Sequence, residues 1–170
     1  SVAHCPQSNL KLASGFCPTE KLRLAGGNVA IGTDGCASNN DLDMFDELRT
    51  AALLAKGVAM DATAMDAAST LRMATLGGAK ALGMEAKIGS LEPGKRADVT
   101  CIALDALETQ PLYHAISQVV YSCGRQQVTD VWIDGKAKLA DGELVDWDVP
   151  GLKAKAKRWR ERIVAVRPAR

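Results

Sequence analysis

The chain has 170 residues, 47% hydrophobic and 24% charged, which is typical of a globular protein with its own core. Its formal net charge of +1 argues against a general nucleic-acid binder or a protein attracted to anionic membranes. No apolar run is long enough to cross a bilayer, and the start lacks the charged and apolar regions of a secretory signal.

Short apolar segments alternate with amphipathic ones in the first half of the chain. Strand, loop and helix in this order are typical of βα units and of a parallel sheet. The first strand begins without a preceding cap or linker, which suggests a fragment of a longer protein. In chain order we expect a strand over residues 1–4, a loop over 6–15, a helix over 18–25, a strand over 28–32, and helices over 42–56 and 64–82.

The second half changes character after a turn-rich segment at residues 87–95. Two Asp-Gly pairs, beginning at Asp134 and Asp141, are signals for tight hairpins. They indicate a small antiparallel β unit beside the βα part. We expect strands over residues 97–103, 128–133, 136–139 and 143–146, and a helix over 113–121.

Residues 152–166 predict an amphipathic helix. Leu152, Trp159 and Ile163 share one face, and lysines and arginines occupy the others. We favour a packed helix with a solvated face because the apolar stripe is narrow; binding to anions or to a membrane surface is the alternative. We therefore expect neither nucleic acid nor membrane among the partners.

Asp34 is the strongest candidate for chemistry. It follows the apolar strand expected over residues 28–32, and a polar residue at the C-terminal end of a barrel strand points into the catalytic mouth. A carboxylate there can bind a cation such as zinc and can accept a proton from a water whose pKa the metal lowers. The residue types alone leave open a second interpretation, in which Asp34 only stabilises a turn between Gly32 and Gly35.

Other polar side chains lie near the same strand ends. Ser38, Asn39 and Asn40 can hydrogen-bond a polar substrate, and one of them, Asn40 in our interpretation, can cap the following helix. His4 could be a ligand or a substrate contact, although a hydrogen-bonded structural histidine is the favoured interpretation. Ser8 and Asn9 allow the same two interpretations, and His114 is expected to be structural or on the surface.

The chain does not carry a complete metal site in its sequence. It has two histidines, no HxH pair and no CxxC pair, whereas a catalytic zinc takes about three protein ligands. The five scattered cysteines argue against a zinc ribbon or a disulfide scaffold, and we expect small buried thiols in a reducing cytoplasm.

Two motifs resemble the amidohydrolase superfamily and, more narrowly, its 5-methylthioadenosine/S-adenosylhomocysteine deaminases. They are HCPQSNLKLASG at residues 4–15 and GTDGCASNNDLDMF at 32–45. The segments RMATLGGAKALG at 72–83, ISQVVY at 116–121 and VWIDGK at 131–136 also resemble that family. IGSLEPGKRADV at 88–99 is shared by many amidohydrolases, so it supports the superfamily and not the substrate.

The resemblance implies an α/β fold. The chain would hold the C-terminal part of a (β/α)8 metal-dependent hydrolase barrel, with strands seven and eight and the following helices, plus the C-terminal share of a small β-sandwich. A whole barrel needs about 250 residues, so roughly the first six strands are missing. The expected divisions are residues 1–86 for the barrel units, 87–146 for the β-sandwich portion and 147–170 for the amphipathic helix.

The resemblance also implies a reaction and a site. It assigns Asp34 as metal ligand and catalytic proton acceptor, and Ser38 as a substrate contact. The cofactor would be a divalent metal, zinc by preference, with its other ligands outside this chain. The reaction would be hydrolytic deamination of the adenine ring of 5′-methylthioadenosine or S-adenosylhomocysteine, giving an inosine-type product and ammonia.

The partners implied are the nucleoside thioether and the missing N-terminal portion of the same enzyme, without which the chain is expected to be inactive. Formation of a homo-oligomer stays open. One alternative is another amidohydrolase, such as a guanine or 8-oxoguanine deaminase or a triazine hydrolase. A second alternative is a non-catalytic fragment that acts only as a scaffold.

Overall fold

The computed structural model describes residues 1–166 of the chain. In chain order its elements are β1 (Val2–His4), α1 (Pro6–Lys11), α2 (Thr19–Leu24), β2 (Val29–Ile31), α3 (Met44–Ala59), α4 (Ala67–Arg72), a π-helical turn (Met73–Gly77), α5 (Gly78–Ala81), β3 (Val99–Ile102), a 3-10 turn (Leu107–Thr109), α6 (Ala115–Tyr121), a 3-10 turn (Arg125–Gln127), β4 (Val128–Ile133), β5 (Lys136–Ala140), β6 (Glu143–Leu144) and α7 (Val149–Val166).

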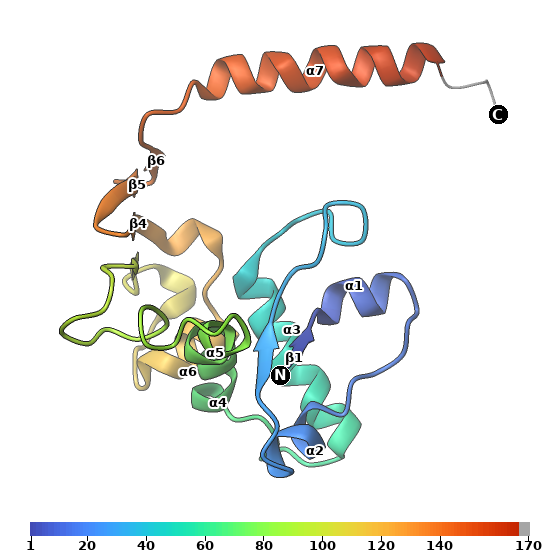
Figure 1. The fold of residues 1–170 in the computed structure, drawn as a ribbon, viewed down its shortest axis with the longest axis vertical. Coiled ribbons are helices and arrows are strands. Elements are labelled where there is room, and N and C mark those ends of the chain that lie inside the picture. The colour runs from blue at the N-terminus through green and yellow to red at the C-terminus, as the bar shows by residue number, and fades with distance from the viewer. Residues whose placement is uncertain (167–170) are drawn as a thin grey trace.

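The first half is built on β1 and β2, which pair in parallel (Figure 1). All three residues of β2 are buried, as expected for a strand covered on both faces. Val29 and Ile31 of this strand pack against Leu48 on α3 and against Met65 and Met73. This cluster is the main core, and the strands expected over residues 1–4 and 28–32 are confirmed.

The helix expected over residues 64–82 is present but contains a π-helical turn at Met73–Gly77. Asp66 caps its start by accepting a hydrogen bond from a backbone N–H of the first turn. At Gly77 the helix backbone lies so close to β2 that an added Cβ would stand 2.8 Å from the carbonyl oxygen of Val29. The π-turn therefore lies where the helix presses directly on the strand.

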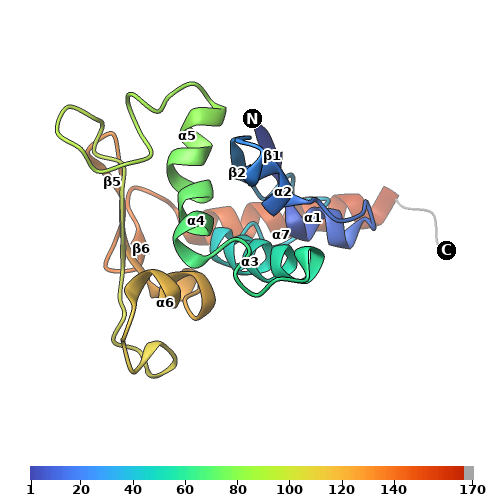
Figure 2. The same ribbon diagram turned by 90° about the horizontal axis from the view of Figure 1, so that it is seen from below.

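The second half forms a four-stranded antiparallel sheet in the order β3-β4-β5-β6. The hairpin residues Asp134 and Gly135 have φ angles of 52° and 74°, and Asp141 and Gly142 have 49° and 78°. Positive φ at both central positions is what such turns require, so both predicted hairpins are confirmed. Helix α6 joins the two halves by lying beside α3 and α4 (Figure 2), where Val120 is fully buried.

Two local predictions in the first half were wrong. The segment expected to be a loop over residues 6–15 begins with α1, because Pro6 stands in its first turn, where a fixed φ favours a helix. Asn40 does not cap α3. Asp43 does so by accepting a hydrogen bond from the N–H of Phe45, and the helix begins two residues later than expected, at Met44.

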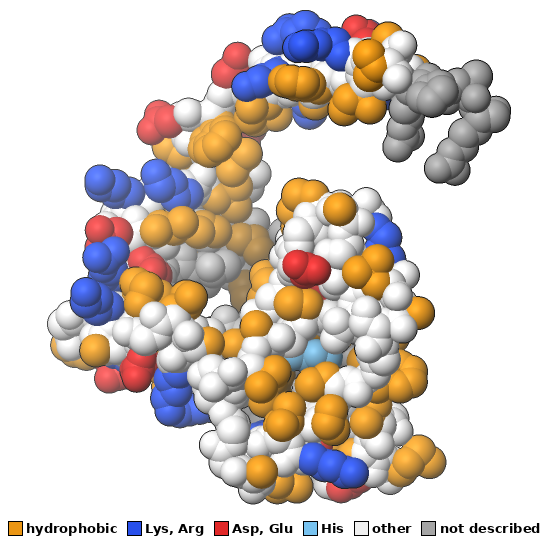
Figure 3. Space-filling view, turned by 45° about the vertical axis from the view of Figure 1, so that its right-hand side comes forward, with side chains coloured by type: hydrophobic (Ala, Val, Ile, Leu, Met, Phe, Trp, Pro, Cys, Tyr) orange, Lys and Arg blue, Asp and Glu red, His pale blue; other side chains and the backbone are white. Residues whose placement is uncertain are grey.

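Helix α7 is present, but its expected packing is not. Every residue from Leu152 to Val166 is exposed, because no other part of residues 1–166 covers the helix. Figure 3 shows it arching over the molecule, with lysine and arginine side chains gathered on it and open space beneath. No helix in the described part of the chain is long and apolar enough to span a membrane.

Candidate active site

The C-terminal ends of β1 and β2 lie side by side. His4 pairs with Ile31 in the register, and the N–H of Gly32 donates to the carbonyl oxygen of His4 at 3.0 Å. The segments that follow, the start of α1 after β1 and the loop over residues 33–43 after β2, are therefore neighbours. The carboxyl edge of a parallel sheet is where α/β proteins place their ligand-binding groups.

Asp34 lies at this edge with its carboxylate held by two hydroxyl groups. Its φ is 62°, a left-handed conformation that aspartate tolerates better than most residues. Ser8 Oγ donates to Asp34 Oδ2 at 2.8 Å, and Ser38 Oγ donates to the same oxygen at 2.6 Å. One serine belongs to α1 and the other to the loop after β2, so Asp34 joins the two strand-end segments.

These contacts favour the ionised form of the carboxyl group. The hydrogen bonds from Ser38 and Ser8, followed by the N–H of Gly35, hold the pKa of Asp34 below its ordinary value. Asp34 is itself exposed, so little burial opposes this effect. At neutral pH the residue is a carboxylate on an accessible edge, able to bind a cation or to accept a proton.

Neither histidine lies with Asp34 in a group of candidate metal ligands within residues 1–166. His4 is buried, and its Nδ1 atom has no hydrogen-bond partner in residues 1–166, so the expected hydrogen-bonded histidine is not found. Burial lowers the pKa of His4 and favours its neutral form. His114 is structural, as expected: its Nδ1 accepts the N–H of Ser117 and caps α6.

Glu47 is a polar residue of this region that the sequence analysis missed. It lies in the first turns of α3 and is fully buried. The N–H of Gln7 donates to its Oε2 at 3.3 Å, and the Nδ2 group of Asn39 donates to its Oε1. A signal was present, because Glu47 falls at helical spacing between Met44 and Ala51 on the apolar face of the helix.

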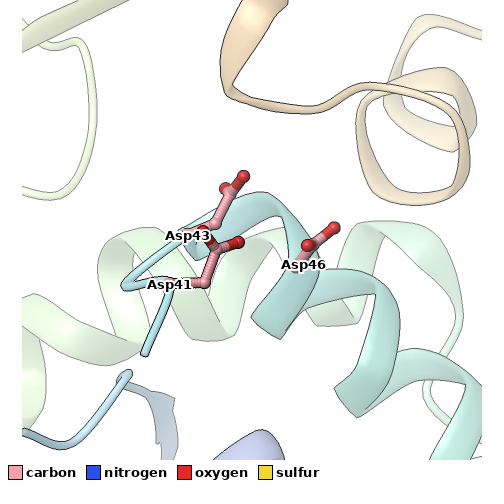
Figure 4. Close-up of side chains that lie close together, drawn as sticks. All are labelled: Asp41, Asp43 and Asp46. Carbon is pink, nitrogen blue, oxygen red and sulfur yellow. The ribbon is translucent and has the colours of Figure 1, made fainter. Parts of the chain in front are cut away.

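An acidic cluster near the start of α3 does not form a cation site. Asp41, Asp43 and Asp46 bring carboxylate oxygens within 4.8 Å of one another (Figure 4). Arg125 forms ion pairs with Asp41 and with Asp43, the latter at 3.0 Å, and Arg49 lies 3.4 Å from Asp46. Guanidinium groups already neutralise this cluster, which ties α3 to the turn before β4.

A cavity of about 300 Å³ lies away from Asp34. It opens beside Asn28, at the opposite end of β2, and carries the cations Arg23, Arg72 and Lys80 on its rim. Arg23 is paired with Glu20 at 2.6 Å, and all three cations are exposed. The cavity and the strand-end carboxylate are therefore separate features.

The described residues fit a divalent metal only in part. Asp34 offers a carboxylate oxygen, which is a suitable zinc ligand. Within residues 1–166 no histidine or cysteine joins Asp34 in a group of three candidate ligands, whereas a catalytic zinc takes about three. Asp34 can therefore supply one metal ligand, and the other ligands of a catalytic zinc are not found beside it within residues 1–166.

Known proteins resemble this chain over almost its whole length. The 5-methylthioadenosine/S-adenosylhomocysteine deaminase of Teredinibacter turnerae is 51% identical over 166 residues, which cover 98% of this chain and 38% of the relative. The protein of the same name from Saccharophagus degradans is 47% identical, over 98% of this chain and 37% of the relative. The chain thus spans about 38% of the length of these relatives.

Solved structures share the fold. A crystal structure of an adenosine deaminase from Xanthomonas campestris with bound zinc matches with a TM-score of 0.95 and 66% identity, covering 97% of this chain and 38% of that one. A variant of atrazine chlorohydrolase from Arthrobacter aurescens, complexed with zinc and atraton, has a TM-score of 0.86 and 27% identity over 93% of this chain and 35% of that one.

The family comparison covers both paired strands and the segment around Asp34. The model of the amidohydrolase family matches residues 1–138, which is most of the chain and includes both strand-end loops. The expected resemblance is therefore confirmed, and the chain belongs to the amidohydrolase family.

Proposed function

We propose that this chain is the C-terminal part of a hydrolytic deaminase that acts on the adenine ring of 5′-methylthioadenosine or S-adenosylhomocysteine. The observation that carries the proposal is the ionised Asp34 at the ends of two parallel strands, held by Ser8 and Ser38. The relatives that match 98% of the chain bear the name of this activity, which supplies the substrate class.

The fold proposed for the whole enzyme is a (β/α)8 barrel with a small β-sandwich. Residues 1–86 would be its last two βα units, and the parallel pairing of β1 with the fully buried β2 supports this. Residues 87–146 would be the C-terminal share of the sandwich, consistent with their separate antiparallel sheet. Residues 147–170 would be the terminal segment that contains α7, and its last four residues, 167–170, lie outside the described part of the chain. A complete barrel needs about 250 residues, so roughly six strands would come from outside the chain.

In the proposed reaction, water replaces the exocyclic amino group of the adenine ring and ammonia leaves. Asp34 would be one ligand of a divalent cation, zinc by analogy with the relatives' structures. When bound, that cation supplies Lewis-acid chemistry that makes water nucleophilic near neutral pH. The Asp34 carboxylate, which its lowered pKa keeps ionised, would accept a proton of the attacking water and pass it to the departing amino group, which then leaves as ammonia.

Ser38 is proposed to contact the substrate beside Asp34. Its hydroxyl group lies 2.6 Å from Asp34 Oδ2, so a ligand that reaches the carboxylate also reaches this serine. A hydroxyl group has one proton and two lone pairs. While it donates to Asp34, Ser38 can still accept a hydrogen bond from a polar substrate.

The partner proposed for this chain is the remaining portion of the enzyme. The relatives are more than twice as long as the aligned segment, and Asp34 alone is one ligand where about three are needed. The isolated chain is therefore proposed to be inactive. A reducing cytoplasm is the proposed location, because all five cysteines are unpaired.

The test is an assay of ammonia release by the full-length protein that contains this chain. We expect turnover of 5′-methylthioadenosine or S-adenosylhomocysteine, and a loss of more than about 10³-fold in kcat/KM for Asp34→Asn. Asp105→Asn, a change at an exposed residue of the other half of the molecule, serves as the control and should retain activity. Wild-type protein with no deaminase activity, or a fully active Asp34→Asn variant, would overturn the proposal.

A triazine or related heterocycle is the second candidate substrate. The likeness to atrazine chlorohydrolase, at a TM-score of 0.86, favours it, although the identity of 27% is well below the 51% of the deaminase relative. Including atrazine, guanine and 8-oxoguanine in the same assay separates these substrates. A protein that turns over none of them, with or without zinc, would be a non-catalytic scaffold.

A further inference from the structure

Glu47 is a fully buried carboxyl group that the proposed reaction does not use. Burial raises its pKa, and this effect is opposed by the donors that face it, the N–H of Gln7 and the side-chain amide of Asn39. A buried carboxyl group is costly unless its oxygens are hydrogen-bonded. Both oxygens of Glu47 have partners, and the partners come from two different segments of the chain.

The two segments are the ones that hold Asp34. Gln7 directly precedes Ser8, and Asn39 directly follows Ser38. Each oxygen of Glu47 therefore binds the immediate neighbour of a serine whose hydroxyl group donates to Asp34 Oδ2. One buried side chain of α3 thus contacts both segments that carry the serines bound to Asp34.

We propose that Glu47 is a positioning residue for Asp34, acting through Gln7 and Ser8 on one side and through Asn39 and Ser38 on the other. It touches neither substrate nor metal. Because it lies on a long helix packed into the main core, it connects both α1 and the loop after β2 to α3. The inference rests on the proposed role of Asp34.

The geometry demands an acceptor at both oxygens of this side chain. Asn39 cannot turn its amide to suit a change, because its Oδ1 already accepts the N–H groups of Asp41 at 3.1 Å and of Leu42 at 2.9 Å. In Glu47→Gln, one oxygen can still accept the N–H of Gln7, but the new NH₂ group faces the NH₂ group of Asn39. The side chain keeps its shape, but its hydrogen bond to Asn39 is replaced by two donor groups that face each other.

A reversed pair restores the link. In Glu47→Gln combined with Asn39→Asp, the new amide donates to one oxygen of the new carboxylate. The other oxygen of that carboxylate still accepts from the N–H groups of Asp41 and Leu42. Each of these hydrogen bonds then has one donor and one acceptor, and only the direction of the hydrogen bond between positions 47 and 39 is reversed. A side chain that merely filled space would not need this compensation.

The experiment compares four forms of the full-length protein: wild type, Glu47→Gln, the double variant, and Asp46→Asn. Asp46 precedes Glu47 on the same turn, but it is not buried, and within residues 1–166 its only ion pair is with Arg49. We expect kcat/KM to fall about 10- to 100-fold in Glu47→Gln, mainly through a lower kcat. Displacement of a catalytic group by about 1 Å reduces the reaction rate by up to about this factor. The double variant should recover to within about threefold of wild type, and Asp46→Asn should stay at wild type.

Crystal structures of the same four forms give a readout independent of turnover. In Glu47→Gln, at least one serine hydroxyl group should move beyond about 3.5 Å from Asp34 Oδ2, and in the double variant both should return. Unchanged serine contacts in Glu47→Gln, or no recovery in the double variant, would overturn the inference. A wild-type protein that deaminates none of the substrates defeats the proposed function instead, and the serine distances still decide the role of Glu47.

Discussion

The strand-end region around Asp34 and the terminal helix α7 differ in how far their side chains are packed against the rest of the molecule. Around Asp34, hydrogen bonds link α1, the loop after β2 and the start of α3, beside a buried core. Helix α7 is the longest element, yet none of its side chains is buried in residues 1–166. The apolar side chains beside Asp34 are buried by neighbouring elements of this chain, whereas the apolar stripe of α7 is not buried by any other element within the described residues.

The largest stability difference should separate these two regions directly. Leu48→Ala removes a side chain that is 4% exposed in the core beneath Asp34, and it should cost about 2–5 kcal/mol of unfolding free energy. Trp159→Ala in α7 removes a side chain that is 50% exposed and should cost less than about 0.5 kcal/mol in the 170-residue chain. Urea unfolding of both variants gives the comparison.

The Trp159 result also sharpens the proposal of a longer enzyme. If the remaining portion covers α7, Trp159→Ala should become clearly destabilising in the full-length protein, because the apolar stripe is then buried. Equal and large costs for Leu48→Ala and Trp159→Ala in the 170-residue chain would show that α7 is packed, and would contradict the exposed helix.

A second comparison lies within the core, at two neighbouring glycines. A Cβ on Gly77 would stand 2.8 Å from the carbonyl oxygen of Val29, whereas on Gly78 the nearest contact is the carbonyl oxygen of Met73 at 3.9 Å. Gly77→Ala should push the helix away from β2 and cost about 1–3 kcal/mol. Gly78→Ala should be neutral or stabilising by up to about 1 kcal/mol, because alanine favours a helix. Melting temperatures of the two variants check this, and equal shifts would refute the close approach.

Sequence alone predicted the elements with strong local signals. The hairpins at Asp134 and Asp141 and the buried strand at residues 28–32 depend on turn chemistry and on apolar runs that any window reveals. Helix α1 was missed because proline suits both a loop and a first helical turn. The cap of α3 was misplaced by three residues because several capping residues stand in a row in that loop.

In the candidate site, too, features with a local sequence signal were predictable and contacts between distant segments were not. The place of Asp34 just beyond a strand end was predictable because an apolar run precedes it, whereas its role stays a prediction. The hydrogen bond from Ser8 to Asp34 was not predictable from the sequence, because it joins residues 26 apart and depends on the parallel pairing of two strands. Glu47 was missed because a glutamate near a helix start usually faces solvent, although its spacing places it on the apolar face of α3.

The smallest expected effect concerns an ion pair outside both regions. The pKa of Glu20 lies below its ordinary value, first because of the hydrogen bond from Arg23 and also because the N–H of Met65 donates to it at 3.1 Å. A carboxyl group with a depressed folded-state pKa stabilises the protein above its unfolded pKa of about 4.5 and loses that stabilisation as the pH falls through the folded value.

Glu20→Gln should therefore cost about 0.5 kcal/mol at pH 7, a small amount because Arg23 is 41% exposed and the pair is screened by solvent. The difference from wild type should shrink as the pH falls below 4.5, and also in high salt at pH 7. Glu85→Gln is the matched control, since Glu85 is exposed and forms no ion pair within residues 1–166. Unfolding curves at pH 7 and pH 3 decide the point: a cost that persists undiminished at pH 3 would mean that Glu20 acts through the shape of its contact with Met65 and not through its charge.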